Sequence, residues 1–261
     1  MKSFVQVWYE ALHDIMLNGR EVSPRGKLTK EIPQRTMEVD MRRPVLVVPD
    51  RKLSYTFMAA EAHWILSGDN RVETIAPYNK NISQFSDDGV KFFGAYGPKI
   101  IDQLEYVVDK LAEDPDTRQA GLTIWRECPT ATKDVPCTVA IFFNIRDGLL
   151  NAHVFMRSSD VWLGIPYDVF NFSMLAHIVC GCLRVQYGVE VEPGVLYLTA
   201  ASSHLYEVHF EQAQQLLNKL EPFVQYPTPS ELHRNPKVLM DYLDKLRHSS
   251  PGDKLRWWEL K

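Results

Sequence analysis

Apolar residues recur at intervals of three and four along several stretches of the chain, which is the spacing of one face of an α-helix. The first stretch contains Phe4, Trp8, Leu12 and Ile15 and predicts a helix that ends near residue 18. The same spacing predicts four further helices, at residues 55–66, 100–111, 169–186 and 205–220. Residues 72–97 interleave Asn, Ser, Gly and aromatic residues without a period, so we expect a loop-rich segment there.

Strand-like runs occupy the middle of the chain and return near its end. They predict strands at residues 121–125, 138–145 and 149–156, and another within 189–198. The residues Arg146-Asp147-Gly148 predict a hairpin turn between the second and third of these strands. The run at 138–145 is apolar at both parities, so it needs cover on both faces, from helices or from a partner subunit. With no internal repeat and no clear linker, the pattern predicts one α+β domain over residues 1–261.

Composition narrows the class of protein. Hydrophobic residues make up 45% of the 261 residues and charged residues 24%, which is typical of a folded globular chain. The formal net charge is −4, so we expect no nucleic-acid partner, while a local basic pocket for one phosphate is compatible with it. No run of 18 apolar residues is present, and Glu10, His13 and Asp14 interrupt the first helix. We therefore expect neither a membrane span nor a signal peptide.

The cysteines and histidines give one candidate for chemistry. Four cysteines in a chain of this length form no disulfide scaffold, so we expect a reducing, cytoplasmic environment. The sequence has no phosphate-binding glycine loop, no HExxH and no CxxC pair, so we expect no metal. His177, Cys180 and Cys182 lie in an apolar helix and are interpreted as core residues. Cys137 follows Val135-Pro136 at a boundary between loop and strand, where a side chain is held rigidly and still faces a cleft.

A polar block follows the predicted hairpin that Cys137 opens. Residues 157–168 read RSSDVWLGIPYD and place one arginine, two serines and two aspartates within a dozen positions. An arginine beside Cys137 favours the thiolate and binds an anion. On its own a lone cysteine is more often inert packing than a nucleophile, so both interpretations stay open at this point.

Three segments together resemble the thymidylate synthase family: VPC at 135–137, RSSDVWLGIPYD at 157–168 and SSHLYEVH at 202–209. The resemblance runs from the first helix to about Leu217. Four further positions follow in the order of the family, namely Arg25, Glu61, Tyr96 and Arg118. The resemblance implies an α+β fold in which helices pack a mixed β-sheet and the sheet also forms the interface of an obligate homodimer.

The resemblance also implies a covalent mechanism. In this family a cysteine thiolate adds to C6 of a pyrimidine nucleoside monophosphate, and C5 takes the methylene of 5,10-methylenetetrahydrofolate. The matches to catalytic positions are Cys137 as nucleophile, Glu61 and Tyr96 as groups that move protons, and Asp168 as the group that reads the base. The matches to nucleotide-binding positions are Arg25, Arg157 and Ser158 at the 5′-phosphate, Arg118 donated there by the other subunit, and His204 and Tyr206 at the 3′-hydroxyl. The matches to folate-binding positions are Asp160, Gly164 and Tyr167.

Without the resemblance, several of these residues have ordinary structural explanations. Glu61 and Arg118 would be surface charges, and Arg118 beside Asp116 would form an ion pair of little energetic value. Tyr96 and Tyr206 would be half-buried packing residues. Only the order of the family positions raises these residues to candidates for function.

Asp168 departs from the family pattern, in which asparagine reads uracil at this position. Cytosine offers a 4-amino group and an N3 acceptor, which a carboxyl group matches by accepting one hydrogen bond and, when protonated, donating another. Burial raises the pKa of a carboxyl group and so favours the protonated form. The same replacement resembles the deoxycytidylate and cytidylate 5-hydroxymethylases of the family, so we expect cytosine as the base.

A second departure concerns the fate of the methylene. Thymidylate synthases carry shielding tryptophans in a region where this chain has none between Trp64 and Trp125. Polar residues and one phenylalanine occupy that region instead, namely Asn79, Asn81, Ser83 and Phe85. We therefore expect a wetter site in which water attacks, giving a 5-hydroxymethyl product and tetrahydrofolate.

Three smaller departures follow. Gln119 and Thr138 replace an arginine and a histidine of the family, and the tail ending in Trp257-Trp258 does not match its closing segment.

The leading hypothesis is thus a hydroxymethyltransferase acting on CMP or dCMP, bacterial or phage-encoded and acting in the host cytoplasm. The alternatives are a methylase or thymidylate synthase that forms dihydrofolate, and an inactive homologue that binds nucleotide or RNA. The residues do not distinguish ribose from deoxyribose.

Overall fold

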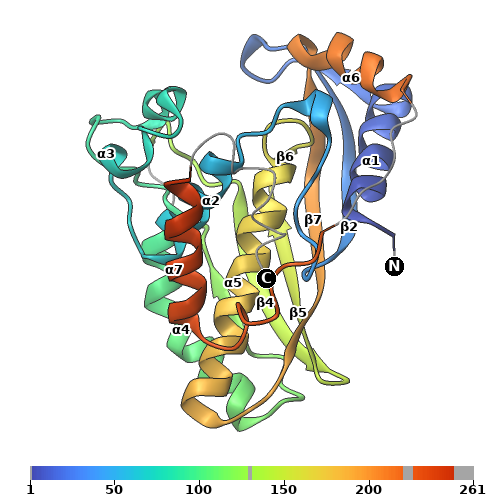
Figure 1. Cartoon of the computed structure of the whole chain (residues 1–261). Helices are drawn as coiled ribbons and strands as arrows, with labels where there is room; N and C mark the ends of the chain where they lie inside the picture. Colours follow the sequence, from blue (N-terminus) through green and yellow to red (C-terminus); the bar gives the residue numbers. More distant parts are fainter. Residues whose placement is uncertain (1, 129–130, 220–225, 250–261) are drawn as a thin grey trace.

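A mixed β-sheet forms the centre of the computed structural model, which describes residues 2–128, 131–219 and 226–249 (Figure 1). The strand order is β1-β2-β7-β5-β4-β3, and β6 pairs with β7. The strands are β1 (Arg20–Val22), β2 (Thr29–Asp40), β3 (Gly121–Thr123), β4 (Thr138–Arg146), β5 (Leu149–Met156), β6 (Ser159–Asp160) and β7 (Glu192–Tyr206). Strand β7 is parallel to β5 and β6, and the other pairs are antiparallel. The predicted α+β class with a mixed sheet is confirmed.

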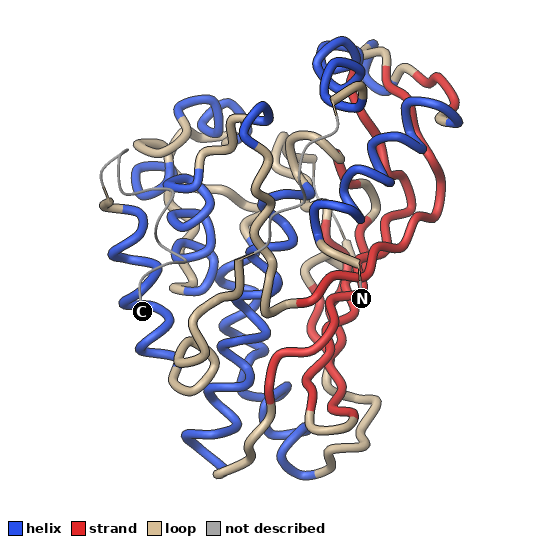
Figure 2. Tube along the Cα trace, turned by 45° about the vertical axis from the view of Figure 1, so that its right-hand side comes forward, coloured by secondary structure: helices blue, strands red, loops and turns tan. Residues whose placement is uncertain are grey.

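Most of the helices gather on one side of this sheet, while α1 and α6 lie together beside β2 and β7 (Figures 1 and 2). The helices are α1 (Phe4–Asn18), α2 (Tyr55–Leu66), α3 (Val72–Ile75), α4 (Tyr96–Glu113), α5 (Ile165–Tyr187), α6 (Phe210–Leu217) and α7 (Pro236–Arg247). The buried apolar side chains of these elements form one hydrophobic core. The expected interpretation of residues 1–261 as one domain is compatible with that core, although the tail with Trp257-Trp258 lies outside the described residues.

Helix α5 is the crossover between the parallel strands β5 and β7 and is apolar on all sides. It is long and apolar enough to cross a membrane by length and composition alone, but 78% of its most apolar window is buried inside the protein. The helix begins at Ile165, before the predicted residue 169, because Pro166 suits a first helical turn. It ends at Gly188, whose φ of 68° gives the left-handed cap that favours glycine.

Gly181 lets α7 approach α5 closely. A Cβ atom at this position would lie 2.8 Å from Cδ and 3.0 Å from the backbone N of Pro236. We expect Gly181→Ala to lower the free energy of unfolding by about 1–2 kcal/mol, because the clash outweighs the gain in helix propensity. Thermal unfolding of this variant and of Cys182→Ala, its control on the same helix, measures the effect. An unchanged or higher Tm for Gly181→Ala would contradict this packing.

The longest elements that were absent from the sequence analysis are β2 and α7. Strand β2 was missed because few of its side chains are buried, notably Met37 and Val39, and because Pro33 and Gln34 (φ 51°) interrupt the alternation. Helix α7 lies in the part of the chain after residue 220, for which no element was predicted. Its buried residues Leu239, Leu243 and Leu246 have helical spacing, and the Asn235 side chain caps its first turn.

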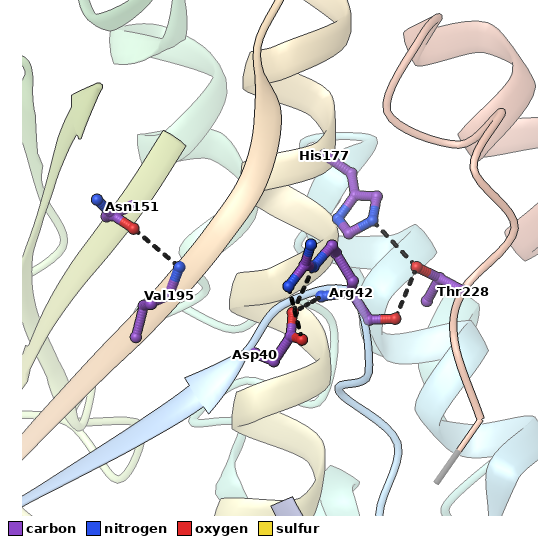
Figure 3. Close-up of polar contacts among 6 residues, drawn as sticks. All are labelled: Asp40, Arg42, Asn151, His177, Val195 and Thr228. Carbon is purple, nitrogen blue, oxygen red and sulfur yellow. Dashed lines mark hydrogen bonds and ion pairs between the residues drawn. The ribbon is translucent and has the colours of Figure 1, made fainter. Parts of the chain in front are cut away.

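Polar contacts tie α5, the end of β2 and the segment before α7 together (Figure 3). The buried His177 ring contacts the Ser173 carbonyl oxygen at 2.7 Å and the Thr228 hydroxyl at 3.3 Å. The Thr228 backbone N–H donates to the Arg42 carbonyl oxygen at 2.8 Å, and the Arg42 guanidinium pairs with Asp40. Burial lowers the pKa of His177 to about 4, so the ring is neutral near pH 7. The interpretation of His177 as a core residue is confirmed.

On the outer face of the sheet, two aromatic side chains are left exposed by the residues that the structure describes. On β4, Ile141, Phe143 and Ile145 are buried in the core, whereas Phe142 on the other face is 42% exposed. Phe155 of β5 is 45% exposed and meets the Phe142 ring edge to face, with 6.5 Å between ring centres. The core therefore covers one of the two apolar faces predicted for this strand.

Candidate active site

The β4–β5 hairpin brings Cys137 and Arg157 together at its open end. Thr138 pairs with Met156, and the Arg157 backbone N–H donates to the Cys137 carbonyl oxygen at 2.8 Å. The Arg157 side chain is held by the carbonyl oxygens of Pro136 and Val135, each at 3.0 Å. Its Nη2 atom lies 3.6 Å from the Cys137 sulfur, and the Ser158 hydroxyl oxygen lies 3.8 Å from the same sulfur. These three side chains thus form one cluster.

The pKa of Cys137 depends on both burial and charge. Burial raises the pKa of the Cys137 thiol above its ordinary value, and the nearby carboxyl of Asp168 raises it further. The positive charges of Arg157 and Arg25 lower it, but not enough to outweigh burial. Arg157 therefore favours the thiolate, as expected, but desolvation is the larger effect and leaves the pKa of Cys137 above its ordinary value.

Tyr96 connects Cys137 to a cavity beside it. Its hydroxyl oxygen accepts a hydrogen bond from the backbone N–H of Thr138 at 3.1 Å, and its ring stacks on Phe172. Burial, together with the charges of Asp168 and Cys137, raises the pKa of the phenol well above its usual range. Tyr96 therefore stays protonated and keeps a proton to donate.

The cavity has a volume of about 170 Å³, is open to solvent, and contains three polar side chains from α2 and α5. Glu61, Asp168 and Asn171 line it, and Asn171 Nδ2 donates to Glu61 Oε2 at 2.8 Å. Burial raises the pKa of Glu61 to about 7. Burial and the neighbouring acidic groups Glu61 and Asp160 raise the pKa of Asp168 well above its ordinary value. The raised pKa of Glu61 suits proton transfer near neutral pH.

A second cluster lies where β2 pairs with β7. The register sets Thr29 opposite Tyr206, and the Tyr206 hydroxyl accepts a hydrogen bond from Arg25 Nη2 at 3.1 Å. The His204 ring meets the Tyr206 ring edge to face, with 5.2 Å between centres. Arg25 has a φ of 55° in the turn between β1 and β2. The structure thus brings Arg25, His204 and Tyr206 together.

Arg118 is the one candidate that the single chain does not bring to these clusters. It is exposed, and it lies in the loop between α4 and β3. That loop contacts Arg146 through the Pro115 carbonyl oxygen at 3.3 Å, at the end of β4 opposite Cys137. This placement is compatible with a role in another subunit's site and not in its own.

The residues expected to bind folate surround the start of α5. Asp160 Oδ1 accepts the backbone N–H groups of Trp162 and Leu163 at 2.8 and 2.9 Å, while its Oδ2 is buried and has no partner among the described residues. A Cβ atom on Gly164 would lie 3.1 Å from Asp168 Oδ2, so glycine leaves room for that carboxyl group. The Tyr167 hydroxyl accepts the Ser54 backbone N–H at 3.2 Å. An unpaired buried carboxylate oxygen fits the N–H groups of a pterin.

Two polar residues of the cavity were missed by the sequence analysis. Asp134 is half-buried and accepts the Gly94 backbone N–H at 2.6 Å. Asn171 is 5% exposed and sits one helical turn after Asp168. A signal for Asn171 was available, because an amide in the apolar run of α5 needs a polar partner.

The tryptophan-free segment does not make the cavity polar. Apart from Tyr96, its contribution to the lining is apolar and includes Ile82, Phe85 and Phe92. The residues Asn79, Asn81 and Ser83, which were expected to make the site polar, are not part of the lining. The role expected of these three residues was therefore wrong, because the residues of the short helix η3 (Lys80–Phe85) that line the cavity are Ile82 and Phe85. The other polar groups of the lining come from α2, α5 and Asp134.

Within the described ranges, no group of three or more His, Cys, Asp or Glu residues is placed to hold a metal ion.

Comparison with known proteins matches the chain to one family. The family model described as thymidylate synthase matches residues 6–244. A deoxyuridylate hydroxymethyltransferase of Bacillus phage SP01 is 33% identical over 224 residues, covering 77% of this chain and 56% of the phage protein. The chain therefore spans about half the length of this relative.

Proposed function

Because the chain belongs to the thymidylate synthase family, we propose that it transfers a one-carbon unit from 5,10-methylenetetrahydrofolate to C5 of CMP or dCMP. The products are the 5-hydroxymethyl nucleotide and tetrahydrofolate. The family match and the name of the phage relative support one-carbon transfer to a pyrimidine nucleotide. The choice of cytosine rests on this chain's own residues.

The clusters support a covalent route. The Cys137 sulfur bonds to C6, and the electrons of the C5–C6 double bond move to C5, which becomes the nucleophile. The folate, when bound, supplies the methylene, and the unpaired Asp160 oxygen and Tyr167 hold and orient it. Glu61 and the Tyr96 hydroxyl move protons around C4 and C5, and Glu61 orients the water that supplies the product hydroxyl. The C6–sulfur bond then breaks and releases the Cys137 thiolate.

The observation that carries the choice of cytosine is the Asp168 carboxyl group. It lines the cavity, its pKa is raised well above the ordinary value, and it makes no hydrogen bond to the residues that the structure describes. A protonated carboxyl group donates to N3 of cytosine and accepts from the 4-amino group. The ring nitrogen N3 is more basic than O4 of uracil, so the shared proton favours cytosine.

A paired assay tests the proposal. Purified protein is given CMP, dCMP or dUMP, each with 5,10-methylenetetrahydrofolate, and the products are identified by mass. The expected result is a 5-hydroxymethylcytosine nucleotide without a rise in dihydrofolate absorbance. Stoichiometric dihydrofolate would instead identify a methylase, and binding without turnover would identify an inactive homologue.

Uridylate is the second candidate substrate, because the phage relative is named for deoxyuridylate. In the same assay, faster turnover of dUMP than of both cytidylates would establish it and refute the choice of cytosine.

We expect Asp168→Asn to shift the ratio of kcat/KM for cytidylate over uridylate toward uridylate by about tenfold or more. The asparagine amide donates to O4 and accepts from N3–H of uracil, but it has no acidic proton to share with N3 of cytosine. Measuring kcat/KM for both nucleotides in both proteins checks this. An unchanged ratio would mean that Asp168 does not read the base.

We also propose that two copies pack through the outer sheet face. The exposed Phe142 and Phe155 form an apolar surface there, and the loop that contains Arg118 contacts the end of β4 opposite Cys137. A homodimer would cover this apolar surface and would place Arg118 near the phosphate bound by the other subunit. A cytoplasmic location stays a prediction.

A further inference from the structure

Asn171 has one satisfied and one unsatisfied polar atom. Its Nδ2 donates to Glu61 Oε2 at 2.8 Å, while its Oδ1 is buried and has no partner among the described residues. The residue is 5% exposed and lines the same cavity as Asp168 and Glu61. A buried carbonyl without a hydrogen bond is unfavourable, so a ligand that donates a hydrogen bond to this oxygen would be favoured.

The orientation of the Asn171 amide follows from its neighbour. An ionised Glu61 carboxylate only accepts hydrogen bonds, so the amide must turn its NH₂ group toward Glu61 and its carbonyl away from it. Burial raises the pKa of Glu61 to about 7, and the carboxylate is therefore ionised at pH 8. Under that condition the cavity contains a fixed acceptor one helical turn from Asp168.

Asp168 alone gives limited discrimination between bases. A protonated carboxyl group carries its proton on either oxygen, so it pairs with N3 and the amino group of cytosine or with N3–H and O4 of uracil. The greater basicity of N3 favours cytosine, but a protonated Asp168 leaves neither base with an unpaired group at these positions. A fixed group near C4 is needed to reject uracil strongly.

We propose that the Asn171 carbonyl is a second base-reading group, which accepts one hydrogen of the 4-amino group of cytosine while Asp168 accepts the other. This inference rests on the proposed function. Uracil has no hydrogen at O4, so it leaves the Asn171 carbonyl oxygen unpaired. Two hydrogen-bond acceptors, uracil O4 and the Asn171 carbonyl oxygen, would then face each other. Strong discrimination arises where a site built to pair with a polar group meets a base that lacks it.

The competing explanation is that Asn171 only positions Glu61. Both roles use the same side chain, but they differ in what a variant changes. Loss of positioning lowers activity or affinity by a common factor for every nucleotide. Loss of the carbonyl acceptor lowers only the values for cytidylate, so the ratio between nucleotides is the measurement that separates them.

The test uses Asn171→Leu, which keeps the branched shape of the side chain and removes the acceptor, at pH 8. We expect Kd for CMP and dCMP, measured by calorimetry without folate, to rise about tenfold more than Kd for UMP and dUMP. The ratio of kcat/KM for cytidylate over uridylate should fall by a similar factor. Asn171→Ala, which cannot clash, is the second variant if the leucine side chain disturbs folding. Ser173→Ala is the matched control, because Ser173 lies on the same helix and donates to the Val169 carbonyl oxygen, away from the cavity.

The outcomes separate this inference from the proposed function. A wild-type preference for cytidylate that both Asn171 variants retain within twofold would overturn the reading role and leave the proposed function intact. A wild-type preference for uridylate would overturn the proposed function, and the inference with it. A selective loss of cytidylate binding in the Asn171 variants, absent in Ser173→Ala, supports both.

Discussion

Cys137→Ala is expected to lower kcat by at least about 10⁴-fold, because the proposed route needs the sulfur that Arg157 and Ser158 surround. Without the sulfur, no bond forms to C6 and C5 gains no electron density. The measurement is release of tritium from C5 of labelled nucleotide in the presence of 5,10-methylenetetrahydrofolate. The fold should persist, since Cys137 is a half-buried residue and alanine fits in its place.

Cys182→Ala is the matched control, because Cys182 is also a partly buried free thiol but lies on α5 away from Arg157. It should keep wild-type activity. Since burial raises the pKa of the Cys137 thiol, the thiolate fraction should grow with pH across the neutral range, and kcat/KM with it. Tritium release by the alanine variant near the wild-type rate would refute the covalent route.

Glu61→Gln should reduce kcat by about 10²–10⁴-fold, the usual contribution of a positioned acid or base. Glutamine keeps an oxygen that accepts from Asn171 Nδ2, but it cannot take or give a proton near neutral pH. The wild-type pH profile should show an inflection near 7, where Glu61 titrates, and the variant profile should lack it. An inflection retained in the variant would assign that titration to another group.

The same variant should be more stable at pH 8. Because the pKa of Glu61 is raised in the folded protein, the folded state binds more protons than the unfolded state between about pH 4.5 and 7. Stability is therefore lost as pH rises through that window, and removing the charge restores it. Tm at pH 8 should rise by roughly 2–6 °C. A lower Tm would show that the buried carboxylate is compensated by contacts that glutamine breaks.

Local signals decided which elements could be predicted from the sequence. Helix α2 has the predicted bounds 55–66, because the Ser54 side chain caps its start and its apolar residues continue to Leu66. Strand β5 has the predicted bounds 149–156, because the turn at Asp147 and Gly148, both at positive φ, fixes where the hairpin begins. Strand β2 is held by long-range pairing with β7. In a mostly polar segment such pairing produces no alternation of apolar and polar residues that would predict a strand.

In the candidate site too, local features could be predicted from the sequence and long-range contacts could not. The resemblance selected Cys137 and Arg157, and the hairpin register brings them together as a local feature. The balance between burial and charge at Cys137 depends on how tightly other elements surround it, which sequence spacing does not express. Asn171 was missed for a similar reason, since its meaning comes from Glu61 on α2, 110 positions earlier in the chain.

The location of Asp168 and Asn171, the groups proposed to face C4, has an evolutionary consequence. Asp168 and Asn171 belong to α5, the buried central helix, whereas Ile82 and the 49% exposed Phe85 belong to the short surface segment η3. Substitutions that change the base must be accommodated in the core, where each one also affects stability. Substitutions in η3 change the cover over the reacting carbon with little effect on the core. In a lineage with this architecture, the product should diversify more readily than the nucleotide it is made from.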